Sequence, residues 1–491
     1  MKKIIFIIIL KIAIAQVTFT YAQQAASKID ITGKVKNQVG QQNLPGDVES
    51  LARNKIPVDG VDLDDTGISV HIDPRGTTKK RPELLTYNHS IKTLHANQNA
   101  GQPSGRLYKT RYPSTSAPDQ VLLTWEGDPR TTQTVSWRTD TTITQGFLAF
   151  QSKRDYQAFL PRKPKVIKAT TTPMITHDVV NDQLINRHAV TLTGLAPNTT
   201  YVYSVGDGIL DNWSEVFEFK TAPNRVESFS FMYIGDAQNG LDRWGSLMQN
   251  AYRMRPDIAF ILLAGDLVNR GAKRDDWDDF FDNAKFFAAT KPFVPVIGNH
   301  ECQGGHPTLY LQLFHLPTNG PEDIEPERVY RFEYGNALFV ILDSNEDPLT
   351  QAKWLEEQLS KSTSTWKFVS FHHPIYSSSP RRDNKKLREV WVPIFDKHHV
   401  DMVLQGHDHA YLRTYPMKDN RKANAPKNGT IYVVSVSGTK MYSQGDYDYT
   451  EKGFAKTSTF QILDIQISGD RLVYRSYDLD GRIKDEFVIE K

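Results

Sequence analysis

Three apolar runs in the second half of the chain, each followed at once by a glycine and a potential metal ligand, constrain the fold most. The runs cover residues 228–234, 257–264 and 293–297, and they end in Gly235-Asp236, Gly265-Asp266 and Gly298-Asn299. Segments 244–252 and 277–287 between them have the length and composition of helices. Strands that alternate with helices at this spacing predict βαβ units and a largely parallel sheet. The carboxyl ends of such strands converge on one crevice, so their polar residues can meet in space.

Two histidine blocks follow later strand-like runs. The run 367–371 leads into His372-His373, and the run 402–404 is followed by Gly406 and the block His407-Asp408-His409. A glycine before a ligand lets the backbone turn sharply and leaves room for an ion. Five short blocks of potential ligands therefore end in the same predicted crevice.

The ligand types in these blocks are mixed. They comprise two aspartates, one asparagine and three histidines, namely Asp236, Asp266, Asn299, His372, His407 and His409. Carboxylate, amide oxygen and imidazole together suit borderline first-row metals such as Mn, Fe, Zn or Co, and they do not suit an all-thiolate site. The sequence therefore predicts a metal centre at the strand ends.

Composition divides the chain of 491 residues, which is too long for one compact core, into four segments. Residues 1–22 run from basic to apolar to small side chains, which is typical of a secretory signal peptide. Residues 23–116 are polar and predict an extended arm, with one strand-like stretch at 68–72. Residues 117–223 alternate with period two between turn residues and predict an all-β sandwich. Residues 224–491 carry the ligand blocks.

Several classes of function have no support in the composition. The formal net charge is +2, so the charge balance indicates no nucleic-acid-binding surface. No run of eighteen apolar residues follows the predicted signal peptide, so we expect no membrane span after its cleavage. The single cysteine, Cys302, excludes an intramolecular disulfide, and it is better interpreted as a small residue than as a nucleophile.

The five blocks, in this order, resemble the calcineurin-like metallophosphoesterase superfamily. Together with the preceding β-rich segment, they resemble its purple acid phosphatase branch, whose N-terminal domain is fibronectin type III-like. The resemblance covers residues 117–491, and five blocks in order are far more specific than any one of them. It implies a mixed α+β and α/β chain, in which an all-β fibronectin-like sandwich precedes a metallophosphoesterase β-sandwich core flanked by helices (αββα).

The resemblance also implies a role for each ligand. Asp266 would bridge two metals, Asp236 and His409 would hold the first, and Asn299, His372 and His407 would hold the second. The implied cofactors are two divalent ions per chain, Mn, Zn or Fe. The histidine beside the asparagine ligand, His300, would contact the phosphate or protonate the leaving group.

Seven more residues lie near these ligands and keep alternative interpretations. Gln238, Asn269 and His373 could add to the metal centre or support it from outside, and His373 is more often a packed residue than a ligand in such a setting. Arg270 could contact phosphate or pair with a nearby carboxylate. For the pair Arg381-Arg382, a solvated charge pair is favoured over recruitment of an anionic substrate. Asp408, between two ligands, is expected to face solvent.

The chain departs from the family pattern at two of these positions. Purple acid phosphatases carry a tyrosine that binds ferric iron where this chain has Asn269, and the wider superfamily often has a histidine where this chain has Gln238. Fewer anionic donors favour a divalent ion at the first site.

The predicted function is a secreted or periplasmic dinuclear-metal phosphatase that hydrolyses phosphate monoesters of small molecules by attack of a metal-bound hydroxide. The first alternative is a phosphodiesterase or nucleotidase on the same site. A non-catalytic binding protein is a third possibility, which the intact set of six ligands disfavours.

Overall fold

The computed structural model describes residues 62–63, 69–72, 78–80, 107–158, 163–209, 212–224, 227–303, 305–466 and 469–491. The signal peptide predicted at 1–22 and most of the arm predicted at 23–116 lie outside the described residues. Within the arm, β1 (Asp62–Leu63), β2 (Ser69–Ile72) and β3 (Thr78–Lys80) form a small antiparallel sheet, and β2 matches the strand-like stretch expected there.

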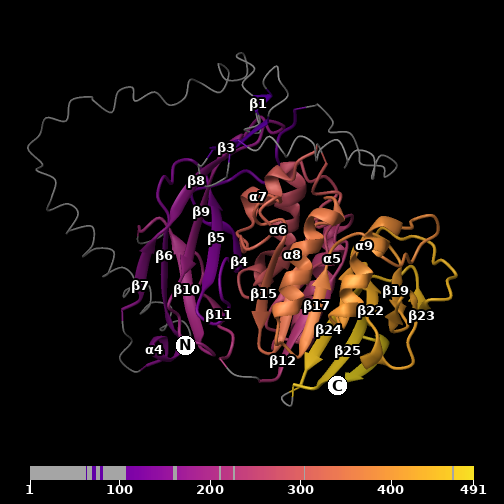
Figure 1. Ribbon diagram of the computed structural model, residues 1–491. Helices are drawn as coiled ribbons and strands as arrows, with labels where there is room; N and C mark the ends of the chain where they lie inside the picture. The colour runs from indigo at the N-terminus through magenta and orange to yellow at the C-terminus, as the bar shows by residue number, and fades with distance from the viewer. Residues whose placement is uncertain are drawn as a thin grey trace, which may run out of the picture.

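The N-terminal domain is all-β, as predicted (Figure 1). Its first sheet has the order β4 (Asp119–Thr124), β5 (Gln133–Thr139), β9 (Leu184–Leu192), β8 (Thr170–Ile175). Its second sheet has the order β11 (Phe217–Lys220), β10 (Thr200–Gly206), β6 (Phe147–Ser152), β7 (Lys165–Lys168), and the single-turn helix α4 (Lys153–Tyr156) follows β6. Alternate side chains of both sheets, such as Trp137, Leu148 and Val205, are fully buried and form one core.

The second domain begins with a mixed sheet. Its order is β14 (Phe293–Pro295), β13 (Ile261–Leu263), β12 (Phe229–Ile234), β24 (Thr459–Ile465), β25 (Arg471–Asp478), β26 (Ile483–Glu490). The first three strands are parallel and are connected through the helices α5 (Leu241–Met254) and α6 (Arg274–Ala288). The last three pair antiparallel, because short turns join them.

A second mixed sheet completes this domain. Its order is β15 (Tyr330–Tyr334), β16 (Ala337–Ile341), β17 (Trp366–Ser370), β18 (Met402–Gln405), β22 (Ile431–Val434), β19 (Tyr411–Thr414), β23 (Thr450–Phe454). The remaining elements are α7 (Thr308–Leu313), α8 (Pro348–Lys361), α9 (Lys385–Lys397), the hairpin β20 (Met417–Lys418) and β21 (Arg421–Lys422), and a 3-10 turn (Pro426–Asn428).

The two sheets of the second domain stack face to face, with helices outside. Phe231 of β12 contacts Phe339 of β16 and Phe368 of β17 at ring-centroid distances of 5.1 and 5.3 Å, so aromatic side chains fill the space between the sheets. Helices α8 and α9 pack on the outer face of the second sheet, where Leu355 and Trp391 are fully buried (Figure 1). The αββα arrangement is confirmed. The expectation of a largely parallel sheet was wrong, because antiparallel strands flank the parallel ones in both sheets.

No helix in the described part of the chain combines the length and the apolar character needed to span a bilayer.

A buried ionic network joins the two domains where β4 and β5 pack on α6. Asp278 of α6, only 4% exposed, binds Arg138 at 3.0 Å and Arg274 at 3.1 Å, and it accepts a hydrogen bond from Gln120 at 2.6 Å. Arg274 also binds Asp182 at 2.6 Å. Arg138 and Arg274 are each paired with two carboxylates, and the network ties the two domains together through buried ion pairs.

We expect Asp278→Ala to destabilise the protein by about 3 kcal/mol, because two buried arginines each lose a partner. The midpoint of urea unfolding measures this change. The control is Asp282→Ala on the same helix. Its side chain is 52% exposed and pairs with the exposed Lys285, so we expect a change within about 0.5 kcal/mol. Equal midpoints for Asp278→Ala and the wild type would show that the network contributes nothing to stability.

Candidate metal centre

Side chains from four loops meet at the carboxyl ends of the parallel strands. Asn299 Oδ1, after β14, lies 2.8 Å from His407 Nδ1 and 3.2 Å from His372 Nε2. His372 Nε2 in turn lies 3.1 Å from Asp266 Oδ2. One ligand atom each from Asp266, His372 and His407 falls within 4.8 Å of the others. The four residues expected at the second metal thus form one compact group.

The remaining predicted ligands adjoin this group on the side of β12. Asp236 Oδ1 lies 3.5 Å from His409 Nε2, while Asp236 Oδ2 accepts a hydrogen bond of 2.6 Å from the backbone N–H of His407. Gln238 Nε2 lies 3.0 Å from Asp266 Oδ2 and 3.3 Å from His409 Nε2. Asp266 therefore lies between two groups of side chains, Asp236 with His409 on one side and Asn299 with His372 and His407 on the other. Gln238 lies beside the first group.

The backbone is strained at three of these residues. Asp236, Asp266 and His407 have φ angles of 42°, 51° and 71°, in the left-handed region that side chains other than glycine rarely adopt. Such strain persists where surrounding structure enforces it, and it clusters at functional sites. The glycines are needed for space, since a Cβ on Gly298 would lie 2.2 Å from Asp266 Oδ1 and one on Gly406 would lie 2.5 Å from Asp236 Oδ2.

Backbone carbonyls fix the orientation of two imidazoles. His372 Nδ1 lies 2.8 Å from the Ala264 carbonyl, and His409 Nδ1 lies 2.8 Å from the Lys440 carbonyl. A carbonyl can only accept, so Nδ1 carries a hydrogen in both rings and Nε2 is the atom that faces the cluster, as a metal ligand requires. Burial lowers the pKa of His372, but the neighbouring Asp266 raises it to about 9 overall, so a bound cation would replace a proton on this ring.

Glu301 is a supporting residue that the sequence did not reveal. Its buried carboxylate accepts backbone N–H groups from Asp266 and Leu267, both at 2.9 Å, and from Gly298 at 2.7 Å. It thereby ties the loop after β13 to the loop after β14. The only sequence signal for Glu301 was its position two residues after the predicted ligand Asn299.

The electrostatics of the cluster fit bound cations. Burial raises the pKa of Asp236 well above its ordinary value, and the nearby Asp266 adds to the rise. Burial also acts on Asp266, but His372 and His300 lower its pKa overall. Burial lowers the pKa of His409 to about 3 and that of His407 well below its ordinary value, so both rings are neutral, as metal ligands must be.

The buried polar atoms of the cluster that lack hydrogen-bond partners also indicate bound cations. Asp236 Oδ1 and Gln238 Oε1 are buried and have no hydrogen-bond partner among the described residues. Two buried carboxylates, one of them incompletely satisfied, beside neutral imidazoles form a donor set that divalent cations complete. The residues present therefore fit a metal centre.

His300, proposed from the sequence as a proton donor, lies at the edge of the cluster. Its Nε2 is 3.8 Å from Asp266 Oδ2, and its Nδ1 lies 2.5 Å from the Asn269 carbonyl. Asn269 thus contributes its carbonyl to the orientation of His300, and its role as a metal ligand stays a prediction. Arg270 forms a two-point ion pair with Asp276, at 2.6 and 3.0 Å, which favours the structural alternative for this residue.

His373 is fully buried behind the ligands. Its Nδ1 lies 2.8 Å from Ser344 Oγ, and its ring centroid is 4.3 Å from that of His407. It packs against the cluster, and its role as an additional ligand or as a supporting residue stays a prediction.

Asp408 does not face solvent, so that expectation was wrong. Its carboxylate is fully buried and accepts backbone N–H groups of Ser378 at 2.8 Å and Ser379 at 3.2 Å, as well as the Nε of Arg382. It was misjudged because spacing between two ligands does not say which way the intervening side chain points.

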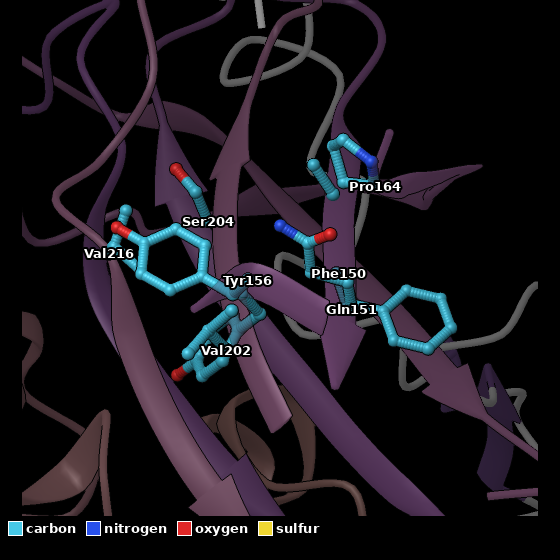
Figure 2. Close-up of a pocket in the computed structure, with 9 residues that line it drawn as sticks. Phe150, Gln151, Tyr156, Pro164, Val202, Ser204 and Val216 are labelled. Atoms are coloured by element: carbon cyan, nitrogen blue, oxygen red, sulfur yellow. The ribbon is translucent and has the colours of Figure 1, made fainter. Parts of the chain in front are cut away.

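The N-terminal domain offers no comparable cluster at the hollow shown in Figure 2. That hollow is lined by Ala149, Phe150, Gln151, Tyr156, Pro164, Val202, Tyr203, Ser204 and Val216. It contains no carboxylate, imidazole or thiol.

Comparison with known proteins supports the same division of the chain. Residues 118–221 match the family model of the purple acid phosphatase N-terminal domain, and residues 229–411 match that of calcineurin-like phosphoesterases. An uncharacterized protein of Mycobacterium tuberculosis is 28% identical over 46% of this chain and 50% of its own length. Purple acid phosphatase 21 of Arabidopsis thaliana is 29% identical over 51% of this chain and 58% of its own. The chain thus spans about half the length of the curated relatives it matches.

One solved structure shares the fold over most of the chain. The purple acid phosphatase PPD1 from yellow lupin (Lupinus luteus) seeds superimposes with a TM-score of 0.65 at 20% identity, covering 76% of this chain and 74% of that one. The fold, the strand-end cluster and the two family matches together identify residues 229–411 as a calcineurin-like phosphoesterase domain. Residues 118–221 are similar to the N-terminal domain of purple acid phosphatases, so the resemblance is to that branch. A phosphoesterase domain of this class implies divalent metal ions.

Proposed function

We propose that this chain is a dinuclear-metal phosphatase that hydrolyses phosphate monoesters. The observation that carries the proposal is the cluster itself, in which Asp266 lies between two groups of buried donors. In the proposed assignment, Asp236, Asp266 and His409 hold the first ion. Asp266, Asn299, His372 and His407 hold the second, which makes Asp266 the shared ligand.

Two divalent ions bound there would supply an activated water for in-line attack and neutralise the charge of the phosphoryl oxygens. The chain itself contributes the proton for the leaving group, and it orients the side chain that donates this proton. His300 Nδ1 donates to the Asn269 carbonyl, so Nε2 is the atom that exchanges a proton at the cluster. In this proposal, the imidazolium form of His300, which carries a proton on Nε2 as well as on Nδ1, gives its Nε2 proton to the departing alkoxide and is left as the neutral ring.

The nature of the first ion gives a prediction. The donors proposed at this position are Asp236, Asp266 and His409, and the neutral amide of Gln238 lies beside them. Purple acid phosphatases that are coloured have a tyrosine where this chain has Asn269. We therefore expect a colourless, divalent-metal protein whose first ion is removed by chelators before the second. A visible spectrum of the metal-loaded protein, followed by metal counting during stepwise chelation, measures both properties.

An intense charge-transfer band would contradict the divalent assignment. It would require a phenolate near the first ion. Tyr411 is unsuitable for this role, because its hydroxyl is engaged with Tyr474 at 2.9 Å and Asp485 at 2.8 Å. Tyr442, whose ring centroid lies 4.7 Å from that of His409, would be the candidate.

The proposal includes export. The order of basic, apolar and small residues in 1–22 favours a cleaved signal peptide, so a secreted or periplasmic location is proposed. N-terminal sequencing of the protein recovered from outside the cytoplasm tests it. A mature protein that begins at Met1 would contradict cleavage.

A substrate comparison tests the function. The protein, loaded with Mn or Zn, is assayed against p-nitrophenyl phosphate and bis(p-nitrophenyl) phosphate. A clear preference for the monoester supports the proposal, while a preference for the diester would favour the phosphodiesterase alternative. Hydrolysis of neither ester by a protein that holds two metals would favour a binding protein.

A further inference from the structure

Arg382 lies against the metal centre although it is not one of the predicted ligands. One of its terminal amines, Nη2, contacts His407 Nε2 and also lies 3.4 Å from the His407 carbonyl. Its Nε donates to Asp408. The other terminal amine, Nη1, makes no hydrogen bond within the described part of the chain, and the side chain is 22% exposed. A cationic donor is thus available where solvent reaches the cluster.

The position of this guanidinium is fixed by its surroundings. Asp408 binds Arg382 and, through its second oxygen, the backbone N–H groups of Ser378 and Ser379. The hydroxyls of Tyr447 and Tyr449 donate to backbone carbonyls of the same loop, at Ser379 (3.1 Å) and Ser377 (2.8 Å). The loop and its arginine are therefore held in place before any ligand binds, which lowers the entropy cost of binding.

An aromatic ring extends this site around the first half of the cluster. The ring of Tyr442 packs on His409 at 4.7 Å, with the guanidinium carbon of Arg382 5.1 Å and the ammonium of Lys440 5.5 Å from its centroid. Arg270, by contrast, is occupied by Asp276 and is not available to an anion. Arg382 is the cation best placed to reach a phosphoryl group at the metals.

We propose that Arg382 binds the non-bridging oxygens of a phosphate monoester and selects the monoester over the diester. This inference rests on the proposed phosphatase function. Near neutral pH a monoester carries close to two negative charges and has three non-bridging oxygens, whereas a diester carries one charge and has two. The planar guanidinium matches such oxygens with more than one N–H group, so the extra charge and the extra oxygen are what it recognises.

The test compares two neighbouring arginines. Arg382→Gln removes the charge at the cluster, and Arg381→Gln removes it from an exposed side chain that makes no ion pair within the described residues. Activity is measured on p-nitrophenyl phosphate and bis(p-nitrophenyl) phosphate. Binding of inorganic phosphate to the metal-loaded protein is measured by calorimetry, and metal content is counted in every variant.

We expect Arg382→Gln to keep its metals and to lose roughly 10- to 100-fold in phosphate affinity and in kcat/KM for the monoester, as for a lost hydrogen bond to a charged group. The diester should change less than about twofold, because it lacks the additional charge. The phosphate affinity and monoester activity of Arg382→Lys should fall between those of the wild type and Arg382→Gln, since lysine keeps the charge but lacks the planar guanidinium. Arg381→Gln should match the wild type.

Three results would overturn the inference. Equal losses for monoester and diester, or unchanged phosphate affinity in Arg382→Gln, would show that Arg382 does not recognise the second charge. So would an equal effect of Arg381→Gln. These outcomes differ from failure of the proposed function, in which the metal-loaded wild type hydrolyses neither ester. In that case calorimetry still decides whether Arg382 binds phosphate.

Discussion

The Asp266→Asn variant is expected to lose at least about a thousandfold in hydrolysis of phosphate monoesters and at least one of its two metals. Asp266 Oδ2 lies between the two groups of donors, 3.1 Å from His372 Nε2 and 3.0 Å from Gln238 Nε2, so one carboxylate is shared by both proposed sites. Its Oδ1 accepts the backbone N–H of His300 at 2.9 Å, and asparagine can retain this bond. The fold should therefore survive. Assay, metal counting and circular dichroism measure the three quantities.

The matched control is Asp242→Asn, which removes an exposed carboxylate on α5 of the same domain. It should keep both metals and wild-type turnover. An Asp266→Asn protein with wild-type turnover and two metals would remove Asp266 from the centre of the proposal.

His300→Ala is expected to lower turnover by about 10²–10⁴-fold while the metals stay bound. His300 is not among the proposed ligands, but its Nε2 faces the cluster, 3.8 Å from Asp266 Oδ2. If it protonates the leaving group, the loss should be smallest for esters with acidic leaving groups, which depart without help. Rates for a series of substituted phenyl phosphates and alkyl phosphates measure this dependence.

His399→Ala serves as the control, because His399 is exposed and precedes β18, at the opposite end of that strand from the ligands that follow it. Equal losses for all leaving groups would contradict the proton-donor role and indicate that His300 positions the phosphate. Unchanged rates would exclude both roles.

The sequence predicted the parts of the centre that depend on strand ends. An apolar run followed by glycine and a ligand marks where a parallel strand finishes, and such ends share an edge of the sheet. Asp236, Asp266, Asn299, His372 and His407 were predicted as ligands on this basis, and the structure places their side chains close together.

The sequence could not predict the contacts that depend on side-chain direction. Asp408 lies between two ligands, and whether it faces solvent or the interior depends on the φ of +71° at His407, which no local pattern reveals. Its partner Arg382 is 26 residues away and reaches it only through the fold. The residue pattern alone did not reveal that β24 pairs with β12 from the far end of the chain, and the two stacked sheets were expected only from the family resemblance.

The most direct test of the account is a metal titration of the wild-type protein. Metal is removed by chelation, Mn or Zn is returned in measured amounts, and hydrolysis of p-nitrophenyl phosphate is followed together with bound metal. A dinuclear phosphatase should show no hydrolysis when metal-free and full activity only when about two ions are bound per chain. Full activity without metal, or after a single ion has bound, would contradict a dinuclear phosphatase.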